Sequence, residues 1–572
     1  MKTTASLIVG FTALACAAPS GWWHHPRPHQ GPPSVSVRNG TYEGVYSPEY
    51  DQDFFLGLPF AQPPVNDLRF SNPVSLNSSF ETVQQATKYS PACVGYGPSQ
   101  VGYNVSEDCL YLNVIRPSSG HHDRTSQDGL PVAVWIFGGG FVQGSGVDKR
   151  YNQSFIVQNS VNMGQPIISV TLNYRLSAWG FLQGEEVLAS GNSNFGLRDQ
   201  RLALHWIKEN IASFGGDPEK VTIWGQSAGA GSVGLHITAY NGRDDGLFRG
   251  GILESGNPIY FGNQDRSAFF NIAYQDLTTA AGCDTAANSL TCLRMVPFAK
   301  LNSIVNTTAL SAIWSPQIDG DIIARHSSQQ LAEGAFVKVP IIEGATSDEG
   351  TSFTPPSVNT TVEFKSDIEA TSPMMNDSFA EALLAAYPDD PSVEVLANLG
   401  PTFRPGPPAG PQYRRAATYY GDENFIANRR VTCQTWAKAG LAAYCYRFNA
   451  IPAWADQLDG ATHFVEVAFA MLNLLGVGYE PFRTPPFQGE PPSYTDLAYL
   501  MSSDWVSFIA NGDPNAWRGR KAHGVPSWPI YSTSTPQDFV YDANVTSYVE
   551  ADTWRSEGID LINSGNLAVY GR

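Results

Sequence analysis

The sequence predicts an α/β fold, with a large, mostly parallel central sheet, helices on both faces and long insertions. Two observations predict it. From residue 132 onward, short apolar runs rich in β-branched and aromatic residues alternate with helix-like stretches, and such alternation builds a parallel sheet that helices cover on both faces. Hydrophobic residues make up 42% of the 572 residues and charged residues 15%, which is typical of a compact globular chain.

The expected strands are the apolar runs at 132–137, 167–173, 221–224, 251–254, 339–343 and 443–448. Helix-like segments lie between several of them, for example 198–214 and 235–240. The Pro-rich stretch 355–440 has helical pieces, and we interpret it as an insertion packed over the edge of the sheet. In such a fold the active site lies beyond the carboxyl ends of the strands.

The N-terminus has the pattern of a secretory signal peptide, residues 1–17. Lys2 supplies the positive charge, residues 5–14 are mostly apolar, and Ala15-Cys16-Ala17 offers small residues for cleavage. The apolar stretch is too short to span a bilayer, and no later run of roughly 18 apolar residues follows it. We therefore expect a secreted, extracellular protein without a stable membrane anchor.

The rest of the chain divides into a Pro- and His-rich lead-in, 18–33, and a single domain, 34–572. The lead-in histidines, His24, His25 and His29, have no partners for a metal site, so a solvated tail explains them better. A formal charge of −18 and an isoelectric point near 4.9 argue against nucleic acid as a partner, because nucleic acid requires a basic surface.

Cysteines and sequons agree with export. Without Cys16, six cysteines remain, and an even number in an exported chain favours disulfides over metal ligands. The couples Cys93/Cys109 and Cys283/Cys292 are natural local bridges, whereas Cys433 and Cys445 are either bridged or buried free thiols. Glycosylation is predicted at eight N-x-S/T sequons: Asn39, Asn77, Asn104, Asn152, Asn306, Asn359, Asn376 and Asn544.

The segment 221–231 carries the decisive motif. Its residues Gly225-Gln226-Ser227-Ala228-Gly229 form a G-x-S-x-G pattern between a buried-looking strand and an apparent helix. In that context the pattern indicates a nucleophile elbow, a strained turn that exposes the serine Oγ between glycines that prevent side-chain clashes. Ser227 is therefore the candidate nucleophile.

A dinucleotide-binding loop is the competing interpretation of this region. Residues 229–234 fit G-x-G-x-x-G, and Glu254 ends the next apparent strand 20 residues later. However, a dinucleotide loop begins directly at the end of a strand, and residues 225–228 intervene here. Small residues that let the helix pack close to the sheet explain the pattern better, so we expect no nucleotide cofactor.

A second glycine-rich segment supplies candidate donors for an oxyanion. Residues Phe137-Gly138-Gly139-Gly140-Phe141 end the expected strand at 132–137, where the oxyanion loop of esterases lies. Glycines there let backbone N–H groups point at the developing negative charge. The N–H of Ala228, next to the nucleophile, adds a further donor.

Chain order narrows the choice of base and acid. In hydrolases with such a nucleophile elbow, the serine precedes the acid and the acid precedes the histidine. Of the ten histidines, only His463 and His523 follow a plausible acid. His463 follows the expected strand at 443–448, whereas His523 lies in a basic, surface-like stretch, so we favour His463. Asp348 and Glu349 both follow the strand at 339–343, and either carboxylate could orient an imidazole.

Together these residues resemble the type-B carboxylesterase/lipase family, the cholinesterase-like branch of the α/β hydrolases, and above all its fungal secreted members. The matching stretches span nearly the whole mature chain and include 57–64, 106–113, 173–176, 196–201 and 347–350. The resemblance implies an α/β-hydrolase fold with Ser227 as nucleophile, Glu349 as acid and His463 as base. It further implies these features: oxyanion donors Gly139, Gly140 and Ala228, disulfides Cys93–Cys109 and Cys283–Cys292, and a structural ion pair Arg69–Glu107.

The chain departs from the family pattern at two places. Gln226 stands where many members carry Glu, which removes a negative charge beside the acyl site. The segment between Cys93 and Cys109 contains no Trp, whereas cholinesterases place their choline-binding Trp there, so choline esters are not expected. Family lipases cover their site with a long apolar flap in this segment, but here only 15 residues separate the cysteines, and Asn104 carries a sequon.

These observations predict a serine esterase that hydrolyses small or medium soluble esters through an acyl-enzyme, without a metal or organic cofactor. Its role could lie in digestion or in secondary metabolism. The alternative within the class is an extracellular lipase on long-chain lipid esters. The alternative outside it is a non-catalytic adhesion or binding protein of the same fold, which would lack a triad member, and all three are present here. The sequence gives no oligomeric state.

Overall fold

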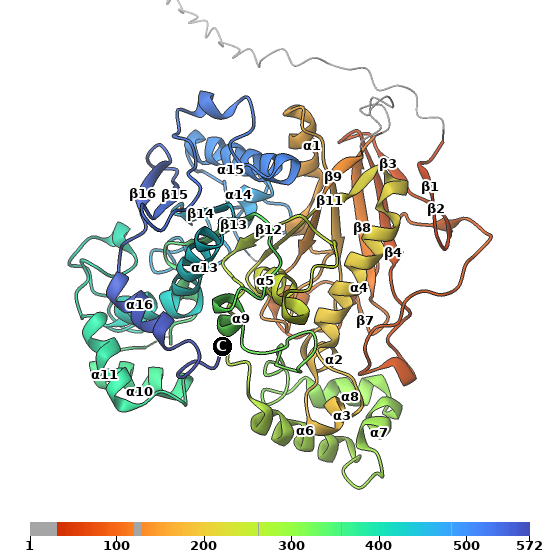
Figure 1. The fold of residues 1–572 in the computed structure, drawn as a ribbon, viewed down its shortest axis with the longest axis horizontal. Helices are drawn as coiled ribbons and strands as arrows, with labels where there is room; N and C mark the ends of the chain where they lie inside the picture. Colours follow the sequence, from red (N-terminus) through yellow and green to blue (C-terminus); the bar gives the residue numbers. More distant parts are fainter. Residues whose placement is uncertain (1–30, 119–128, 261, 356, 482) are drawn as a thin grey trace, which may run out of the picture.

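The computed structural model describes residues 31–118, 129–260, 262–355, 357–481 and 483–572. The predicted signal peptide and most of the lead-in lie outside these residues. Within them, eleven strands form the central sheet, in the order β16-β15-β14-β13-β12-β11-β9-β10-β8-β4-β3 (Figure 1). Their bounds are β3 (Val45–Ser47), β4 (Gln52–Pro59), β8 (Tyr111–Pro117), β9 (Leu130–Ile136), β10 (Ile168–Leu172), β11 (Gly216–Gln226), β12 (Gly250–Glu254), β13 (Ile341–Thr346), β14 (Ala443–Phe448), β15 (Gln537–Tyr541) and β16 (Tyr548–Ala551).

The middle of the sheet is parallel and its edges are antiparallel. Every neighbouring pair from β10 to β15 is parallel. The pairs β8–β10, β4–β8 and β3–β4 at one edge and β15–β16 at the other are antiparallel. Strands β10, β12 and β13 are buried along their whole length, because helices cover both faces of a parallel sheet. The predicted α/β class is therefore confirmed.

The six predicted apolar runs all lie in strands, β9 to β14 in chain order. β11 begins earlier than expected, at Gly216, and β13 begins later, at Ile341. Two small sheets lie outside the central one: β1 (Ser34–Val37), β2 (Gly40–Glu43) and β5 (Gln84–Gln85) form the first, and β6 (Ala92–Cys93) and β7 (Val105–Ser106) the second.

Helices cover both faces of the sheet, and two residues of β12 show which helix covers each face. A side chain added at Gly250 would meet Phe508 of α15 (Pro492–Asn511). One added at Gly251 would meet Val233 and Ile237 of α5 (Ala228–Gly242). Successive residues of a strand point to opposite faces, so α5 and α15 lie on opposite sides of the sheet.

Among the other helices, α6 (Ser267–Ala281), α7 (Ser289–Met295) and α8 (Phe298–Val305) lie below the sheet in the view of Figure 1. The predicted helix at 198–214 is α4 (Phe195–Asn210) followed by a 3₁₀ turn, Ile211–Phe214. The remaining helices are α1 (Ser154–Asn162), α2 (Ser177–Phe181), α3 (Glu185–Ala189), α9 (Ser327–Ala332), α10 (Thr361–Thr371), α11 (Asp377–Ala386), α12 (Tyr413–Gly421), α13 (Ala427–Lys438), α14 (Val467–Ala470) and α16 (Ser556–Ser564).

The stretch 355–440 differs in part from the expected insertion. Its last helix, α13, packs directly against β13 and β14 and belongs to the layer that covers the sheet. A disulfide between Cys433 of α13 and Cys445 of β14 fixes this contact. Only α10, α11 and α12 fit the description of inserted helices. In the part of the chain that the structure describes, no helix is both long enough and apolar enough to cross a membrane.

Candidate active site

Ser227 occupies a strained turn between the last residue of β11 and the first residue of α5. Its backbone has φ 58° and ψ −127°, a conformation that residues with a Cβ rarely adopt. Two backbone hydrogen bonds hold the turn: the Ser227 N–H donates to the carbonyl of Glu254 (2.8 Å), and the Ser227 carbonyl accepts from the Gly231 N–H (2.8 Å). The neighbouring β12 therefore holds the serine in the geometry that the G-x-S-x-G pattern predicted.

The flanking glycines are required because backbones approach each other closely here. A Cβ at Gly229 would lie 2.0 Å from the carbonyl oxygen of Ile136, and one at Gly225 would lie 2.4 Å from the carbonyl carbon of Gly229. A Cβ at Gly234 would lie 2.5 Å from the backbone of Pro258. These contacts support the interpretation of residues 229–234 as small residues that let α5 pack against the sheet.

His463 and Glu349 lie together, although 114 residues separate them in sequence. The imidazole Nδ1 and the Glu349 Oε2 are 2.6 Å apart. The other carboxylate oxygen of Glu349 accepts from the Thr346 N–H at 2.8 Å, and its side chain is fully buried. Because a carboxylate is an acceptor, His463 carries its proton on Nδ1, which leaves Nε2 free to act as a base.

Asp348, the second candidate acid, has a different role in the structure. Its Oδ1 accepts from the Leu396 N–H and its Oδ2 from the Ala461 N–H, both at 2.7 Å. Burial raises the pKa of Asp348, and these two backbone N–H groups oppose that rise. Asp348 thus fixes the loop that leads to His463, while Glu349 is the carboxylate in contact with the imidazole.

His523, the alternative base, lies in a separate 3₁₀ turn, Arg520–His523. Its ring contacts Trp517, with centroids 5.6 Å apart. None of the contacts among the described residues connects His523 with Ser227, Asp348 or Glu349. The structure therefore brings only one of the two candidate histidines to a candidate acid.

The described hydrogen bonds do not include one between the Ser227 hydroxyl and His463. The imidazole Nε2 instead has the side-chain amide of Gln226 as its neighbour, at 3.4 Å from Gln226 Nε2. Hydrogen bonds of catalytic groups are often long in an enzyme without substrate and shorten in the reactive complex. Gln226, where the sequence shows only a missing charge, is therefore a direct neighbour of the His463 imidazole.

The glycine-rich segment after β9 forms an open loop. Gly139 and Gly140 have φ values of 114° and 64°, and Gly140 is exposed. The loop is anchored at its start, where the Tyr174 hydroxyl donates to the carbonyl of Phe137 (2.8 Å) and the two rings stack. Ala228 is the first residue of α5, so its N–H belongs to the unpaired first turn of a helix, which favours negative charge.

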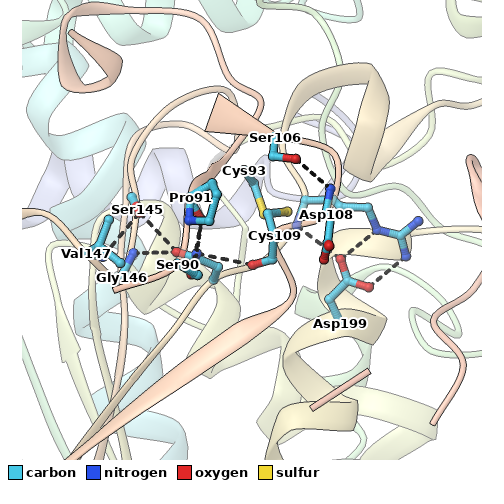
Figure 2. Close-up of a disulfide and its surroundings, with 12 residues drawn as sticks. Ser90, Pro91, Cys93, Ser106, Asp108, Cys109, Ser145, Gly146, Val147 and Asp199 are labelled. Carbon is cyan, nitrogen blue, oxygen red and sulfur yellow. Dashed lines mark hydrogen bonds and ion pairs between the residues drawn. A yellow bond between two sulfur atoms is a disulfide. The ribbon is translucent and has the colours of Figure 1, made fainter. Parts of the chain in front are cut away.

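The end of the same loop is tied to the Cys93–Cys109 disulfide region (Figure 2). The side-chain oxygen of Asn173 accepts from the Ser145 hydroxyl and the Gly146 N–H, both at 3.0 Å. The side-chain nitrogen of Asn173 donates to the carbonyl of Cys109 at 3.2 Å. One asparagine therefore connects the predicted oxyanion loop with the disulfide.

The remaining predicted pairs also occur. Cys283 and Cys292 are joined, so the two bridges implied by the family resemblance are both present, together with the Cys433–Cys445 bridge that the sequence left open. Arg69 and Glu107 form a bidentate ion pair, with contacts of 2.6 and 2.8 Å. Arg69 also donates to three backbone carbonyls at 293–296, which gives this pair a structural role.

Two aromatic side chains lie next to His463, and the sequence did not predict them as part of the site. Phe425 stacks on the imidazole with centroids 4.8 Å apart, and Phe353 meets it edge-on at 5.0 Å. Phe353 is 42% exposed, so it also faces solvent. Phe425 lies in a π-helical turn, Asp422–Ile426, inside the Pro-rich stretch, and no periodic pattern indicates its position.

The fold and the surroundings of Ser227 are those of an α/β hydrolase: a nucleophile turn between a parallel strand and a helix, an imidazole–carboxylate pair from later loops, and a glycine loop opposite. Within the described part of the chain, no cluster of three or more His, Cys, Asp or Glu side chains could hold a metal ion.

Comparison with known proteins defines the family. A family model described as "Carboxylesterase family" matches residues 31–553. The chain is similar to "Lipase 2" of Geotrichum candidum, with 36% identity over 94% of this chain and 95% of that protein. It is similar to "Secreted lipase 1" of Botryotinia fuckeliana, with 34% identity over 94% of each. Its fold is similar to the crystal structure of Aspergillus niger EstA, with a TM-score of 0.81 and 28% identity over 95% of this chain and 100% of that one.

The chain therefore belongs to the carboxylesterase family, as the resemblance in its motifs implied, and it is a carboxylic-ester hydrolase.

Proposed function

We propose that this enzyme hydrolyses small or medium soluble esters by two-step acyl transfer, with Ser227 as nucleophile, His463 as base and Glu349 as the acid that orients it. The 2.6 Å contact between Glu349 and His463 carries the proposal, because it connects the base to a buried carboxylate beside the serine turn. That contact selects the Nδ1-protonated imidazole and stabilises the imidazolium that forms when the serine is deprotonated.

In the first step, His463 Nε2 takes the proton of the Ser227 hydroxyl as Oγ attacks the ester carbonyl. The N–H groups of Gly139, Gly140 and Ala228 receive the negative charge of the tetrahedral intermediate. The intermediate collapses, and the alcohol leaves with the proton from His463. Water then repeats the sequence on the acyl-enzyme, which releases the acid and restores Ser227.

The preference for soluble esters rests on how the Cys93–Cys109 segment is held. Tyr96 N–H donates to the Val142 carbonyl (2.7 Å) and the Gln100 side chain donates to the Gly144 carbonyl (3.0 Å), so the segment is bound to the predicted oxyanion loop. Of its large hydrophobic side chains, only Val101 and Val105 are exposed, at 56% and 38%. Such a segment offers little apolar surface to an oil droplet.

A lipase acting on long-chain esters is the second candidate, and it is supported by the names of the two relatives, "Lipase 2" and "Secreted lipase 1". Hydrolysis rates on a p-nitrophenyl ester series, measured across the solubility limit of each ester, distinguish the two. We expect short and medium chains to be preferred and the rate to level off at the limit. A sharp rise on emulsion formation, with long chains preferred, would make the enzyme a lipase.

The catalytic proposal is tested by Ser227→Ala in the full secreted chain. We expect ester turnover to fall about 10⁴-fold or more with the melting temperature retained, because the residual rate then comes from the oxyanion donors and binding alone. A folded Ser227→Ala protein with a tenth of the wild-type turnover would exclude Ser227 as the nucleophile.

Export belongs to the same proposal. We propose that the protein is secreted after removal of residues 1–17, that residues 34–572 form one domain, and that the eight sequons carry glycans. Relatives named as secreted support export, and the single sheet built from strands between Val45 and Ala551 supports one domain. Six of the eight sequon asparagines are exposed, which supports glycosylation there: Asn77, Asn104, Asn306, Asn359, Asn376 and Asn544.

A further inference from the structure

Two more carboxyl groups lie buried next to the imidazole–carboxylate pair. Glu254 ends β12, and Glu466 directly precedes α14, three residues after His463. Both residues are 0% exposed. Glu466 interacts through its charge with both Glu349 and His463, and Glu254 interacts with Glu466. A buried carboxylate without a cation is unstable, so such a cluster must take up protons.

Glu254 is held rigidly through one of its two oxygens. Its Oε1 accepts from the indole N–H of Trp224 (2.8 Å) and from that of Trp505 (2.6 Å). Trp224 belongs to β11 and Trp505 to α15, so the carboxyl group is clamped between the sheet and the helix that covers this face. The second oxygen, Oε2, has no hydrogen-bond partner among the described residues.

Glu466 has the same arrangement, with one oxygen paired and one unpaired. Its Oε1 accepts from the Ser255 hydroxyl at 3.2 Å, and its Oε2 has no partner in the described part of the chain. Ser255 follows Glu254 directly in sequence. The two carboxyl groups also interact through their charges. Burial is the main cause of the raised pKa of Glu254, and the charge of Glu466 is the second cause. Two buried carboxyl groups in this relation are stabilised when one proton lies between them.

We propose that Glu254 and Glu466 share one proton at neutral pH, with Glu254 as the protonated donor and Glu466 as the ionised acceptor whose charge helps to stabilise the imidazolium of His463. This inference rests on the proposed role of His463 as the base. Glu254 is thereby a positioning residue, which acts on catalysis through Glu466.

The environment favours this division of the proton. Burial, and then the charge of Glu466, raise the pKa of Glu254 well above its ordinary value, although the two indoles oppose the rise. Burial and the charge of Glu349 raise the pKa of Glu466 to about 7, whereas His463 and the Ser255 hydroxyl lower it. Burial and the neighbouring charge therefore favour the protonated form of Glu254, whereas the pKa of Glu466 lies at about 7.

Other titratable groups face the pair from the surrounding elements. The Tyr446 hydroxyl of β14 is buried without a described hydrogen-bond partner and interacts with Glu254, Glu466 and Glu349. Tyr479 also interacts with Glu466 and with Arg150 through their charges. Burial raises the pKa of both tyrosines, so they stay neutral and leave the two carboxyl groups to titrate.

Glu254 stands where the G-x-G-x-x-G pattern predicts the acid of a dinucleotide site, at the end of an apparent strand. In the structure it ends β12, is fully buried, and accepts hydrogen bonds from two indole N–H groups.

The pH dependence of kcat on a soluble p-nitrophenyl ester tests the inference. In the wild type we expect kcat to fall as the pH decreases through about 7, because Glu466 then takes up a proton and its charge disappears. Glu466→Gln removes that charge at every pH, so kcat at pH 8 should fall about tenfold and the component near pH 7 should disappear. Glu254→Gln keeps a neutral donor, so the midpoint should stay within about 0.2 pH units of wild type.

Glu254→Leu removes the donor and leaves the Glu466 charge without a partner, which moves the midpoint up by about one pH unit. If this variant does not fold, the two glutamine variants still decide. If Glu254→Gln lowers kcat as Glu466→Gln does, both residues are ionised. If the pH profile of kcat is unchanged in Glu466→Gln, the pair has no influence on His463. Either result would overturn the inference.

Infrared spectroscopy detects the shared proton directly and without catalysis. At pH 8 the wild type and Ser227→Ala should both show the carbonyl stretch of a protonated carboxyl group, and Glu254→Gln should lose it. Glu343→Gln is the matched control, because burial also raises the pKa of Glu343, on the neighbouring β13, well above its ordinary value. That variant should lose a separate band and keep the pH profile. No loss of a band in Glu254→Gln would exclude the shared proton, whatever the role of Ser227.

Discussion

The two sides of the site are built by different means. The side around His463 is built from side chains: Glu349 is fully buried, and the rings of Phe353 and Phe425 flank the imidazole. On the side of the glycine loop, the proposed oxyanion donors are backbone N–H groups, and Gly140 is exposed to solvent. In the proposed mechanism, burial strengthens the electrostatic interaction on the first side, and fixed backbone dipoles that are open to substrate act on the second.

The largest effect should come from removal of the base. We expect His463→Ala to lower kcat about 10⁴-fold, nearly as much as Ser227→Ala, because triad members act as a unit. His523→Ala is the matched control and should change kcat less than about twofold, since its ring contacts Trp517 and not the site. Steady-state rates on a p-nitrophenyl ester measure both. The opposite order would assign the base to His523.

The two neighbouring acids allow the base side to be tested more finely. Glu349→Gln keeps the shape but loses the charge that orients the imidazole, so kcat should fall about 10³- to 10⁴-fold with the melting temperature nearly unchanged. Asp348→Asn loses an acceptor for a backbone N–H, which should destabilise the fold by about 1–3 kcal/mol and lower kcat less than tenfold. Rates together with thermal unfolding separate the two. Equal rate losses would contradict the division of roles between the acids.

On the glycine side the expected effects are smaller. A Cβ at Gly139 would lie 2.4 Å from the Gln143 carbonyl oxygen, at φ 114°, so Gly139→Ala must move the loop. We expect kcat to fall about 100-fold, the cost of a misplaced oxyanion donor. A Cβ at Gly140 would meet only Val142, at 3.8 Å, so Gly140→Ala should lower kcat less than tenfold. A larger loss in Gly140→Ala would mean that substrate, and not the loop, occupies that space.

The smallest effect concerns Gln226, whose amide lies between the two sides. Gln226→Glu replaces a donor that is 3.4 Å from His463 Nε2 with an acceptor, and we expect kcat to change less than about threefold at pH 8. A loss of more than tenfold would show that the amide positions the imidazole. The measurement therefore decides whether Gln226 belongs to the base side.

The difference between the two sides also explains what the sequence could predict. Motifs with local geometry were predictable: the apolar runs of β9 to β14, the Ser227 turn and the glycine loop each follow from neighbouring residues. The antiparallel edge strands β3, β4 and β8 have no such alternation with helices, so the sequence pattern did not predict them. The choice between Asp348 and Glu349 depends on which carboxyl group meets backbone N–H groups of distant loops, so residues alone left it open.

Long-range side-chain contacts were the least predictable part. Phe425 packs on His463, Glu466 interacts with Glu349 and His463, and Glu254 interacts with Glu466. These residues come from three separate segments of the chain, and no sequence pattern predicts that they meet. The bond between Cys433 and Cys445 is of the same kind, because it requires α13 to lie directly on β14. The sequence therefore predicts local motifs better than contacts between distant segments of the chain.

Labelling with a fluorophosphonate probe tests the central claim most directly, that Ser227 is a nucleophile activated by the Glu349–His463 pair. The account predicts one probe per chain, located on Ser227 by tandem mass spectrometry, and labelling slowed about 10³-fold or more in His463→Ala. Probe on another serine, or equally fast labelling of Ser227 in His463→Ala, would contradict it.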